Sequence, residues 1–431
     1  MKKNNSLKPQ IRFKGYDDEW QQAKVREVFN LGNGYTPSKA VTAYWTNGTI
    51  PWFRMEDIRE NGRVLADAIQ HVTPSAVKSS GLFPAGSIIV STTATIGEHA
   101  LIIADSLANQ RFTVFQTVNR WSWLKANYLL YRFYGLGDWC RRNVNAGGLA
   151  AVNISDLQKY DIDYPKEETE RDSIAEYFSN LDTQIKEAER EVDRLEKMKI
   201  ASLQKMFPRP GATTPEIRFA GFSEPWKTMT FKDVYSSLKN NTLSRDCLNY
   251  NGGIAKNIHY GDVLIKFGAY VNPLSVDVPF VNFNVGIELS SAYKLADGDV
   301  IFADTAEDEA VGKCTEIRGV NDSNVLSGLH TIAVRPNFKF APFYLGYYHN
   351  SNAYHSQLLP LMQGVKVLSI NRTAISETMV AFPSSLDEQR AIGEYFRNLD
   401  ELIAAKRKSI VKLRNIKKAC LSKMFVNDTN L

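Results

Sequence analysis

The sequence ERDSIAEYFSNLD (170–182) returns as EQRAIGEYFRNLD (388–400), 218 positions later in the chain. The match continues at the same offset to ASLQKMF (201–207) and ACLSKMF (419–425). Over the two segments that these motifs enclose, 170–207 and 388–425, 16 of 38 positions are identical. A repeat of this length in each half of the chain indicates a protein built from two similar structural units.

Apolar residues recur at alternating spacings of three and four in both segments, which is the heptad pattern of a coiled coil. The seam positions are Phe178, Leu181, Ile185, Ala188, Val192 and Leu195 in the first segment, and Phe396, Leu399, Ile403, Lys406, Ile410 and Leu413 in the second. Neither 176–207 nor 394–425 contains Gly or Pro. A single helix of this length, about 57 Å at 1.5 Å per residue, cannot bury its seam alone. We therefore expect the two helices to pair as an antiparallel coiled coil.

A second, shorter repeat opens each half of the chain. PQIRFKGY (9–16) matches PEIRFAGF (215–222), and Trp20 matches Trp226 at the same offset. We expect Phe13, Trp20, Phe219 and Trp226 to be packing anchors, because the repeat keeps them in both halves. PRPGATT (208–214) contains two prolines and a glycine and is predicted to end the first helix.

Between the repeats, 21–164 and 227–382 share little sequence and are predicted to be mixed domains of an α+β fold. The expected strands are 87–92 and 112–116 in the first insert, and 261–268, 298–304 and 330–336 in the second. The expected helical segments are 121–135 and 341–358. The predicted layout is a first globular domain with an N-terminal arm (1–166), a long helix (167–207), a linker (208–214), a second globular domain (215–384), a second long helix (385–425) and a tail (426–431).

Composition excludes several classes of protein. The net charge of +5 and the hydrophobic fraction of 44% are ordinary for a soluble protein. The N-terminus has no apolar segment of a signal peptide, and apolar runs such as SIIV (87–90) are too short to span a membrane, so we expect a cytoplasmic protein. The four cysteines and six histidines are scattered, which favours neither a metal site nor disulfides.

The sequence also lacks the common catalytic motifs. It contains no phosphate-binding G-x-x-x-x-G-K-[ST] loop, because in the fragment ending at VGKC (311–314) position 307 is Glu. It contains no G-x-G-x-x-G, H-E-x-x-H or G-x-S-x-G motif and no motif of an amino-methyltransferase. Carboxylate pairs such as Glu56 and Asp57 lie in charged surface stretches. We therefore predict no catalytic residues and no metal ligands in this chain.

The order and duplication of these motifs resemble the specificity (S) subunit of type I restriction–modification systems. The resemblance rests on the two P-x-I-R-F-x-G openings, the segments 32–58 and 241–265, and the closing segments VNISDL…YP (152–165) and SINRTAI…FP (369–383) before each E-x-x-x-I-x-E-Y-F-x-N-L-D helix. It covers essentially the whole chain. In that family the inserts are target-recognition domains, so 1–166 and 215–384 are expected to be two such domains.

The resemblance implies a non-catalytic subunit that binds double-stranded DNA. The expected partners are two methyltransferase subunits, with restriction subunits in the full complex. S-adenosylmethionine, ATP and magnesium are then used by those partners, and this chain itself holds no cofactor. Because the two inserts differ, the DNA target is expected to be bipartite and asymmetric, with an unread central stretch.

Candidate DNA-contacting residues are polar side chains on three predicted loops in each half. In the first half they are Tyr35, Thr36, Lys39, Thr92, Thr93, Thr95, Arg141, Arg142 and Asn145, the last three in a loop that runs to Gly148. In the second half they are Ser244, Arg245, Lys266, Gln363 and Lys366. Arg141, Arg142 and Lys366 rank highest because they occupy equivalent places before the closing segments.

Two other interpretations remain open. The chain could be a coiled-coil scaffold whose domains bind proteins or glycans, in which case salt-dependent binding to duplex DNA would be absent. It could also be an enzyme, such as a nuclease, with an unfamiliar motif.

Overall fold

The computed structural model describes residues 6–145, 150–287, 289–290 and 293–426 of the 431-residue chain. The chain divides into two compact units. The first comprises Met1–Ala188 and Ser409–Leu431, and the second comprises Glu189–Lys408. The first unit is therefore assembled from two separated pieces of sequence, whereas the second is continuous.

The first unit contains ten strands among its described residues, in a mixed α/β arrangement. The strands are β1 (Gln21–Lys24), β2 (Phe29–Asn33), β3 (Ile50–Phe53), β4 (Val64–Leu65), β5 (His71–Val72), β6 (Ile88–Ser91), β7 (His99–Ile102), β8 (Leu107–Ala108), β9 (Phe112–Thr117) and β10 (Asp161–Tyr164). The helices are α1 (Val25–Val28), α2 (Met55–Asn61), α3 (Ala126–Arg142) and α4 (Ile154–Leu157), with 3-10 turns at Thr42–Tyr44, Pro74–Ala76 and Asn119–Trp121.

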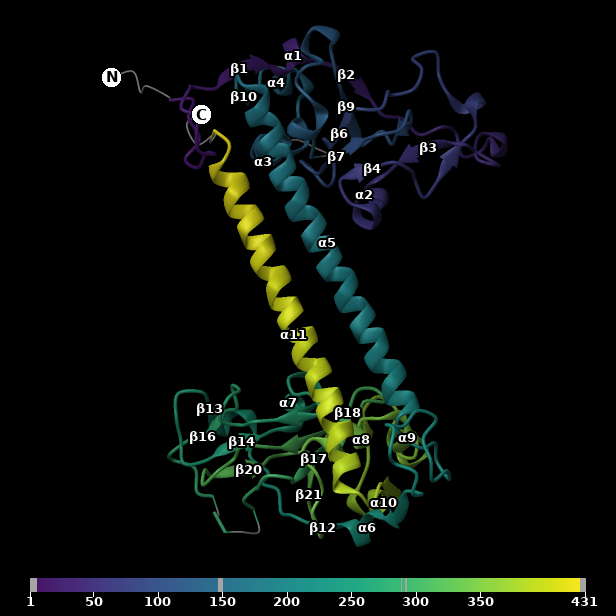
Figure 1. Ribbon diagram of the computed structural model, residues 1–431, viewed down its shortest axis with the longest axis vertical. Coiled ribbons are helices and arrows are strands. Elements are labelled where there is room, and N and C mark those ends of the chain that lie inside the picture. Colours follow the sequence, from purple (N-terminus) through teal and green to yellow (C-terminus); the bar gives the residue numbers. More distant parts are fainter. Residues whose placement is uncertain (1–5, 146–149, 288, 291–292, 427–431) are drawn as a thin grey trace. The chain divides into compact units, whose positions relative to one another are not determined.

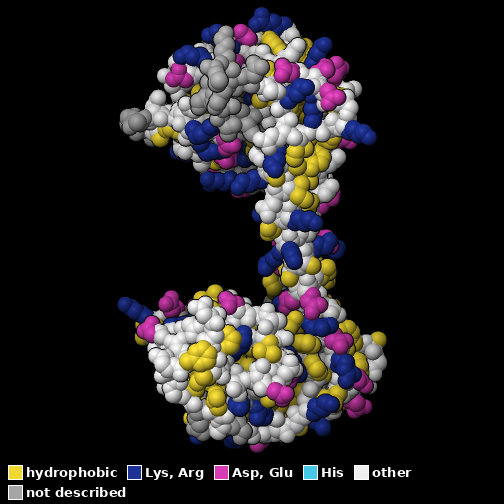
Figure 2. Space-filling model, turned by 90° about the vertical axis from the view of Figure 1, so that its left-hand side faces the viewer, with side chains coloured by type: hydrophobic (Ala, Val, Ile, Leu, Met, Phe, Trp, Pro, Cys, Tyr) yellow, Lys and Arg dark blue, Asp and Glu magenta, His cyan; other side chains and the backbone are white. Residues whose placement is uncertain are grey.

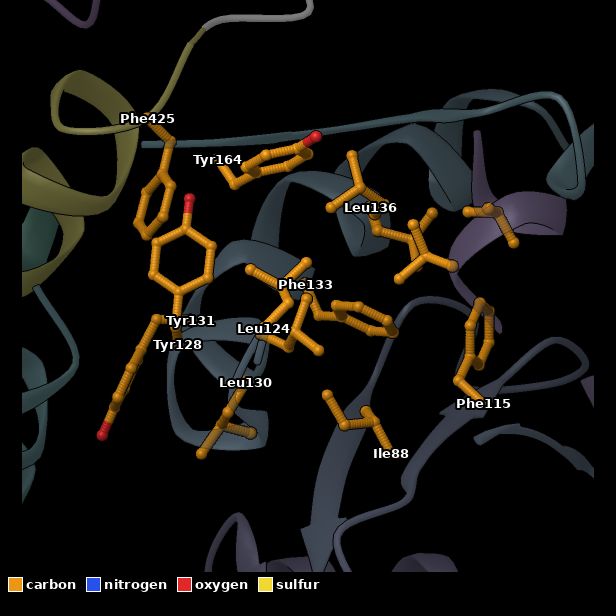
Figure 3. Packing of buried hydrophobic residues seen from close by; sticks show 14 of the residues in the cluster. Ile88, Phe115, Leu124, Tyr128, Leu130, Tyr131, Phe133, Leu136, Tyr164 and Phe425 are labelled. Carbon is orange, nitrogen blue, oxygen red and sulfur yellow. The ribbon is translucent and has the colours of Figure 1, made fainter. Parts of the chain in front are cut away.

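The main sheet of the first unit has the order β2-β9-β6-β7-β4, and β4 is the one strand parallel to its neighbour. A smaller sheet, β5-β3-β8, and the pair β1-β10 complete the unit. The helix α3 packs its apolar face on the main sheet. Figure 3 shows Phe133 of α3 beside Phe115 and Ile88 of the sheet, with the rings of Phe133 and Phe115 5.0 Å apart.

The second unit has thirteen strands among its described residues. They are β11 (Lys227–Thr230), β12 (Tyr235–Ser237), β13 (Leu248–Asn249), β14 (Lys256–Ile258), β15 (Tyr270–Val271), β16 (Phe280–Val281), β17 (Val300–Ala303), β18 (Thr305–Ala306), β19 (Cys314–Ile317), β20 (Val325–Ser327), β21 (Thr331–Pro336), β22 (Leu368–Ser369) and β23 (Met379–Phe382). Its short helices are α6 (Phe231–Val234), α7 (Tyr260–Ile265), α8 (Tyr344–His349), α9 (Asn352–His355) and α10 (Arg372–Ser376), with 3-10 turns at Arg245–Cys247 and Leu359–Leu361.

The second unit repeats the topology of the first. Its main sheet has the order β12-β21-β17-β19-β15, again with only the last strand parallel to its neighbour, and β11 pairs with β23 as β1 pairs with β10. A smaller sheet, β13-β16-β14-β20, corresponds to β5-β3-β8. The expectation that two divergent inserts share one mixed α/β fold is therefore confirmed.

Two long helices follow the globular parts, as Figure 1 shows. They are α5 (Glu168–Lys205) and α11 (Leu386–Lys423), each of 38 residues. In the first unit the beginning of α5 packs against the end of α11, and in the second unit the beginning of α11 packs against the end of α5, so the helices pair antiparallel as expected. The seam residues Leu181, Val192, Leu195, Leu399, Ile403 and Ile410 are buried.

Polar pairs join the C-terminal part of each long helix to the beginning of the other. In the first unit Lys417 forms an ion pair with Asp182, and the hydroxyl of Tyr177 lies 3.4 Å from the Cys420 sulfur. In the second unit Lys199 forms the equivalent ion pair with Asp400. These contacts explain why the repeat keeps polar residues at heptad positions.

The opening motif of each half docks on these helix ends. In the first unit Arg12 forms an ion pair of 2.6 Å with the buried Glu170, and Trp20 packs 6.1 Å from Phe425. The backbone N–H of Ile11 donates to the carbonyl of Lys423 over 2.9 Å. The packing role that the sequence predicts for Trp20 is confirmed.

The same contacts recur in the second unit. Arg218 pairs with Glu388 over 2.7 Å, Trp226 packs 6.3 Å from Phe207, and Ile217 donates to Lys205 over 2.9 Å. Phe13 and Phe219 lie edge-on to Tyr177 and Tyr395, each 6.0 Å away between ring centres, in their own units. The repeated residues thus build a common frame in which each domain contacts the end of one helix and the beginning of the other.

Three secondary-structure expectations need correction. The helical segment expected at 341–358 is two short helices, α8 and α9, with Asn350 and Ser351 between them. The segment 261–268 is not a strand, because residues Tyr260–Ile265 form the helix α7, capped by the His259 side chain and with Val263 in the core. A short apolar run does not distinguish a buried strand from a buried helix. The helix expected at 121–135 begins later, at Ala126, and extends to Arg142.

Candidate nucleic-acid interface

In the first unit three loops meet at the tip of the β6–β7 hairpin. The N–H of Thr92 donates to the carbonyl of Arg111 in the β8–β9 turn over 3.1 Å. The N–H of Val152 donates to the carbonyl of Thr92 over 3.0 Å, which joins the segment after α3 to the same hairpin. The hairpin, the β8–β9 turn and the described residues 143–145 and 150–152 therefore form one polar edge.

The hairpin tip carries backbone strain. Ala94 has φ of +62° although it has a side chain. Such a conformation costs on the order of 1–3 kcal/mol and is concentrated at functional sites. Its presence at the centre of the polar edge favours a binding role for this loop.

The second unit builds the same edge with other residues. The N–H of Asp304 donates to the carbonyl of His330 over 3.1 Å, and the N–H of Ile370 donates to the carbonyl of Asp304 over 2.9 Å. β18 at the hairpin tip also pairs with β22 in the segment after α9. These bonds match those of Thr92 with Arg111 and Val152, so the two edges are equivalent.

Several predicted residues of the first unit have structural contacts. The hydroxyl of Tyr35 donates to the carbonyl of Ala76 over 3.2 Å, and Thr36 bonds to the Gln110 side chain. The hydroxyls of Thr92 and Thr113 lie 3.1 Å apart in a buried pair. Thr95 similarly lies 3.3 Å from the hydroxyl of Ser91. These side chains shape the edge.

Arg141 braces the hairpin. Its guanidinium pairs with Asp138 over 2.5 Å and donates to the carbonyl of Ile96 over 3.3 Å. In the second unit His355 donates to the equivalent carbonyl of Val311 over 2.8 Å. The role of Arg141 is thus repeated by a different side chain, which indicates a structural contribution.

The other two predicted residues of this loop, Arg142 and Asn145, are exposed. Arg142 is exposed, with one long bond of 3.4 Å to the carbonyl of Asp138, and Asn145 is exposed with its N–H on the carbonyl of Ala151. Residues 146–149 of the loop lie outside the described part of the chain. Thr93, half-buried, forms a backbone bridge with Ala151.

In the second unit some predicted residues are likewise held by ion pairs, whereas others are exposed. Arg245 forms an ion pair of 3.0 Å with the buried Asp262, and the Lys266 ammonium lies 3.7 Å from Asp277. Ser244 is exposed. Lys266 lies between α7 and the edge strand β15. Ser244 lies between β12 and β13, in a segment equivalent to 36–39 of the first unit.

Three predicted side chains, two of lysine and one of glutamine, are exposed and can reach a ligand. Gln363 and Lys366 are exposed on a turn that the backbone bonds between Gln363 and Ser369 close, with Gly364 at φ of +122°. Lys39 is exposed and, among the described residues, has no ion pair. These residues have the position and freedom that contact with a ligand requires.

A basic groove lies beside the polar edge of the first unit. It has a volume of about 710 Å³ and runs between α3 and the end of α11. Its basic lining residues are Arg132, Arg141, Arg142, Arg414, Lys417 and Lys418. Figure 2 shows Lys and Arg side chains gathered along one edge of this unit, a distribution suited to a polyanion.

The sequence did not indicate Gln110, Arg111 or His330. Gln110 and Arg111 occupy the β8–β9 turn, and His330 occupies the equivalent β20–β21 turn. Only the register of the two main sheets places these turns beside the hairpin tips, and no local motif marks them.

Buried titratable groups in both units have structural roles. Burial lowers the pKa of His99 and of His349 to about 3. A hydrogen bond of 2.6 Å joins Nε2 of His349 to the hydroxyl of Tyr235 inside the core. In the described part of the chain no three His, Cys, Asp or Glu side chains are grouped closely enough to hold a metal ion. No described helix has the length and hydropathy to cross a membrane.

Comparison with known proteins gives a consistent result. The chain matches the family model described as Type I restriction modification DNA specificity domain over residues 17–197 and again over 223–415. One match falls on each repeat, and together they cover most of the chain.

Curated relatives match over part of their length. The type I restriction enzyme EcoprrI specificity subunit of Escherichia coli is 44% identical over 162 residues, which is 37% of this chain and 40% of that protein. The putative type I restriction enzyme MjaX specificity subunit of Methanocaldococcus jannaschii is 25% identical over 210 residues, 47% of this chain and 46% of that protein. The matched portion thus spans less than half the length of these relatives.

Solved structures match over nearly the whole chain. The type I restriction–modification S subunit from M. genitalium superposes with a TM-score of 0.54 at 12% identity and covers 97% of this chain and 99% of that one. A chain from a structure concerning complex assembly and conformational transition of the type I R-M system gives a TM-score of 0.56 at 16% identity, with 95% and 98% coverage. At these identities the likeness shows a shared fold.

Proposed function

Because the chain belongs to the Type I restriction modification DNA specificity domain family, we propose that it is the DNA-recognition subunit of a type I restriction–modification complex. It has no catalytic role of its own and directs partner subunits to an asymmetric, bipartite target. The observation that carries this proposal is the pair of equivalent polar edges. Two units with one topology but different edge residues suit the reading of two different half-sites.

The proposed DNA contacts are the exposed polar side chains at these edges. For the first unit they are Lys39, Arg142 and Asn145, with the basic groove as a path for the phosphate backbone. For the second unit they are Ser244, Gln363 and Lys366. Cations at such positions supply most of the sequence-independent affinity for DNA. Tyr35, Thr36, Thr92, Thr93, Thr95, Arg141, Arg245 and Lys266 position the loops in this proposal.

The proposed protein partners are two methyltransferase subunits, with restriction subunits in a full complex. The common frame repeats exposed residues that its own packing does not explain, namely Glu176 and Asn180 on α5 and Glu394 and Asn398 on α11. Two equivalent surfaces suit two copies of one partner. S-adenosylmethionine, ATP and magnesium belong to these partners, and the complex is proposed to act in the cytoplasm.

The test is to replace residues 227–382, inside the proposed recognition domain 215–384, with the insert of a relative and to map methylated adenines in cells. Only one half of the methylated target should change, because the first domain (1–166) and the helices stay intact. A change in both halves would contradict independent reading. Unmodified chain that forms a complex with the methyltransferase but shows no salt-dependent binding to duplex DNA would leave only a scaffold role.

A further inference from the structure

The turns before β9 and β21 occupy the same place in the two units. Arg111 ends the first turn and His330 ends the second, and each carbonyl accepts a bond of 3.1 Å from the hairpin residue opposite, Thr92 or Asp304. The strands after the turns are also in the same register, because Ser91 pairs with Phe112 and Ala303 pairs with Thr331. Arg111 and His330 are therefore equivalent residues with different chemistry.

The turn that carries Arg111 is fixed by its surroundings. Asn109 donates its N–H to the carbonyl of Phe53 over 2.9 Å, and its side-chain oxygen accepts the N–H of Arg111 over 3.0 Å. Gly34 packs so closely that an added Cβ would lie 2.1 Å from the Asn109 carbonyl oxygen. A side chain on such a turn is presented from a rigid base, which direct base reading requires.

The turn that carries His330 is fixed as well, and it is strained. The N–H of Gly328 donates to the carbonyl of Ile258 over 2.8 Å. His330 itself has φ of +53°, a left-handed conformation that favours glycine. A histidine kept in this conformation at the centre of a polar edge points to a functional demand on its side chain.

The side chains at the two positions are open to a ligand. Arg111 is exposed and, among the described residues, its guanidinium has no hydrogen bond or ion pair. Its neighbours at the edge, the Thr36–Gln110 and Thr92–Thr113 pairs, are uncharged. The His330 side chain is 48% exposed, with Nδ1 3.3 Å from a carboxylate oxygen of Asp304 and its ring edge-on to Tyr260.

We propose that Arg111 and His330 are the direct base-reading residues of the first and second unit. This inference rests on the proposed function and goes further by assigning specificity to one position per unit. The Arg111 guanidinium is suited to guanine, whose O6 and N7 accept its two parallel donors in the major groove. His330, whose Nδ1–H donates to the Asp304 carboxylate, presents the lone pair of Nε2 to a hydrogen-bond donor on a base edge. A phosphate contact would not call for different residues at two equivalent positions, because the backbone is the same at both half-sites.

The test uses the full chain assembled with its methyltransferase partner and a library of randomised duplexes, with binding measured over a range of salt concentrations. The variants are Arg111→Ala, Arg111→Lys and His330→Gly, the last chosen because glycine relieves the left-handed strain. Arg59→Ala is the matched control, since Arg59 is an exposed arginine of the same unit on α2 with no ion pair among the described residues. Hydrogen exchange of each variant checks that the unit is folded.

Arg111→Ala should lose about 5- to 150-fold discrimination at one base pair of one half-site and leave the other half-site unchanged. Arg111→Lys should keep the salt dependence and relax the same base pair, because lysine lacks the two parallel donors. His330→Gly should reduce the specificity at a single base pair in the other half-site. Arg59→Ala should change neither half-site.

Uniform weakening across all sequences, with the salt slope reduced by about one charge, would identify Arg111 as a phosphate contact and overturn the proposal. Unchanged specificity in both Arg111→Ala and His330→Gly would overturn it as well. Failure of the unmodified complex to bind any duplex would instead overturn the proposed function, and this is visible before any variant is compared.

Discussion

Phe425 joins the end of the chain to the core of the first unit, and its removal should open that unit alone. The side chain is 6% exposed and packs 6.1 Å from Trp20, 6.0 Å from Tyr128 and 5.9 Å from Phe178, between ring centres. Figure 3 shows it beside Tyr128. Phe→Ala substitutions in cores cost about 3–5 kcal/mol. The three neighbouring rings are themselves at most 2% exposed and cannot easily fill the space, so we expect about 4 kcal/mol for Phe425→Ala.

A cost of about 4 kcal/mol raises the opening constant of the first unit by roughly a thousandfold, because each 1.4 kcal/mol is a factor of ten. Amide hydrogen exchange with peptide-level mass spectrometry measures this directly. Peptides from α3 and β10 should exchange faster, and those from α8 and β23 should not. Phe207→Ala provides the mirror experiment, because Phe207 fills the equivalent place in the second unit, 5.8 Å from Phe396. Unaltered exchange in α3, or faster exchange in both units with either variant, would refute the view that each helix end completes one unit.

Three further outcomes are expected. Leu413→Ala, at a half-buried seam position, should lower the free energy of unfolding by about 2 kcal/mol, measured by denaturant titration; no loss would place Leu413 outside the seam. Asn180→Ala combined with Asn398→Ala should weaken assembly with the methyltransferase without lowering the melting temperature, as native mass measurement would reveal; intact assembly would place the docking surface elsewhere. Burial lowers the pKa of His349 to about 3 from an ordinary 6.5, so the folded state binds fewer protons and stability should fall as the pH drops below about 6.5. Melting curves of the wild type and of His349→Gln should differ in this slope, and equal slopes would contradict the linkage.

The sequence predicts the common frame of this protein well, because the residues that build it occur as a repeat in both halves of the chain. The equal spacing of Tyr177, Phe178 and Leu181 and of Tyr395, Phe396 and Leu399 indicates both the helices and their pairing. The polar seam pairs were not predicted, because the repeat shows that Asp182 and Asp400 recur but not that they pair with Lys417 and Lys199.

The polar edges were less predictable, for a physical reason. Arg111 and His330 lie in short turns without a motif, and only the strand register brings them to the hairpin tips. Arg245 is an obvious DNA-contact candidate in the sequence, yet an ion pair with Asp262 occupies it. The helix α7 was mistaken for a strand because its six residues are too few to show the helical period.

The division of the first unit between the two ends of the chain also governs when it can fold. Residues 189–408 form a continuous unit, and all of it is synthesised before residue 409. The first unit must wait for the end of α11 and for Phe425, which at ordinary rates of synthesis takes on the order of ten to fifty seconds after residue 188. Until Phe425 arrives, the pocket formed by Trp20, Tyr128 and Phe178 stays open, so the half of the protein made first is completed last. A chain cut short by a premature stop would keep that apolar pocket exposed and would be a ready substrate for cellular proteases.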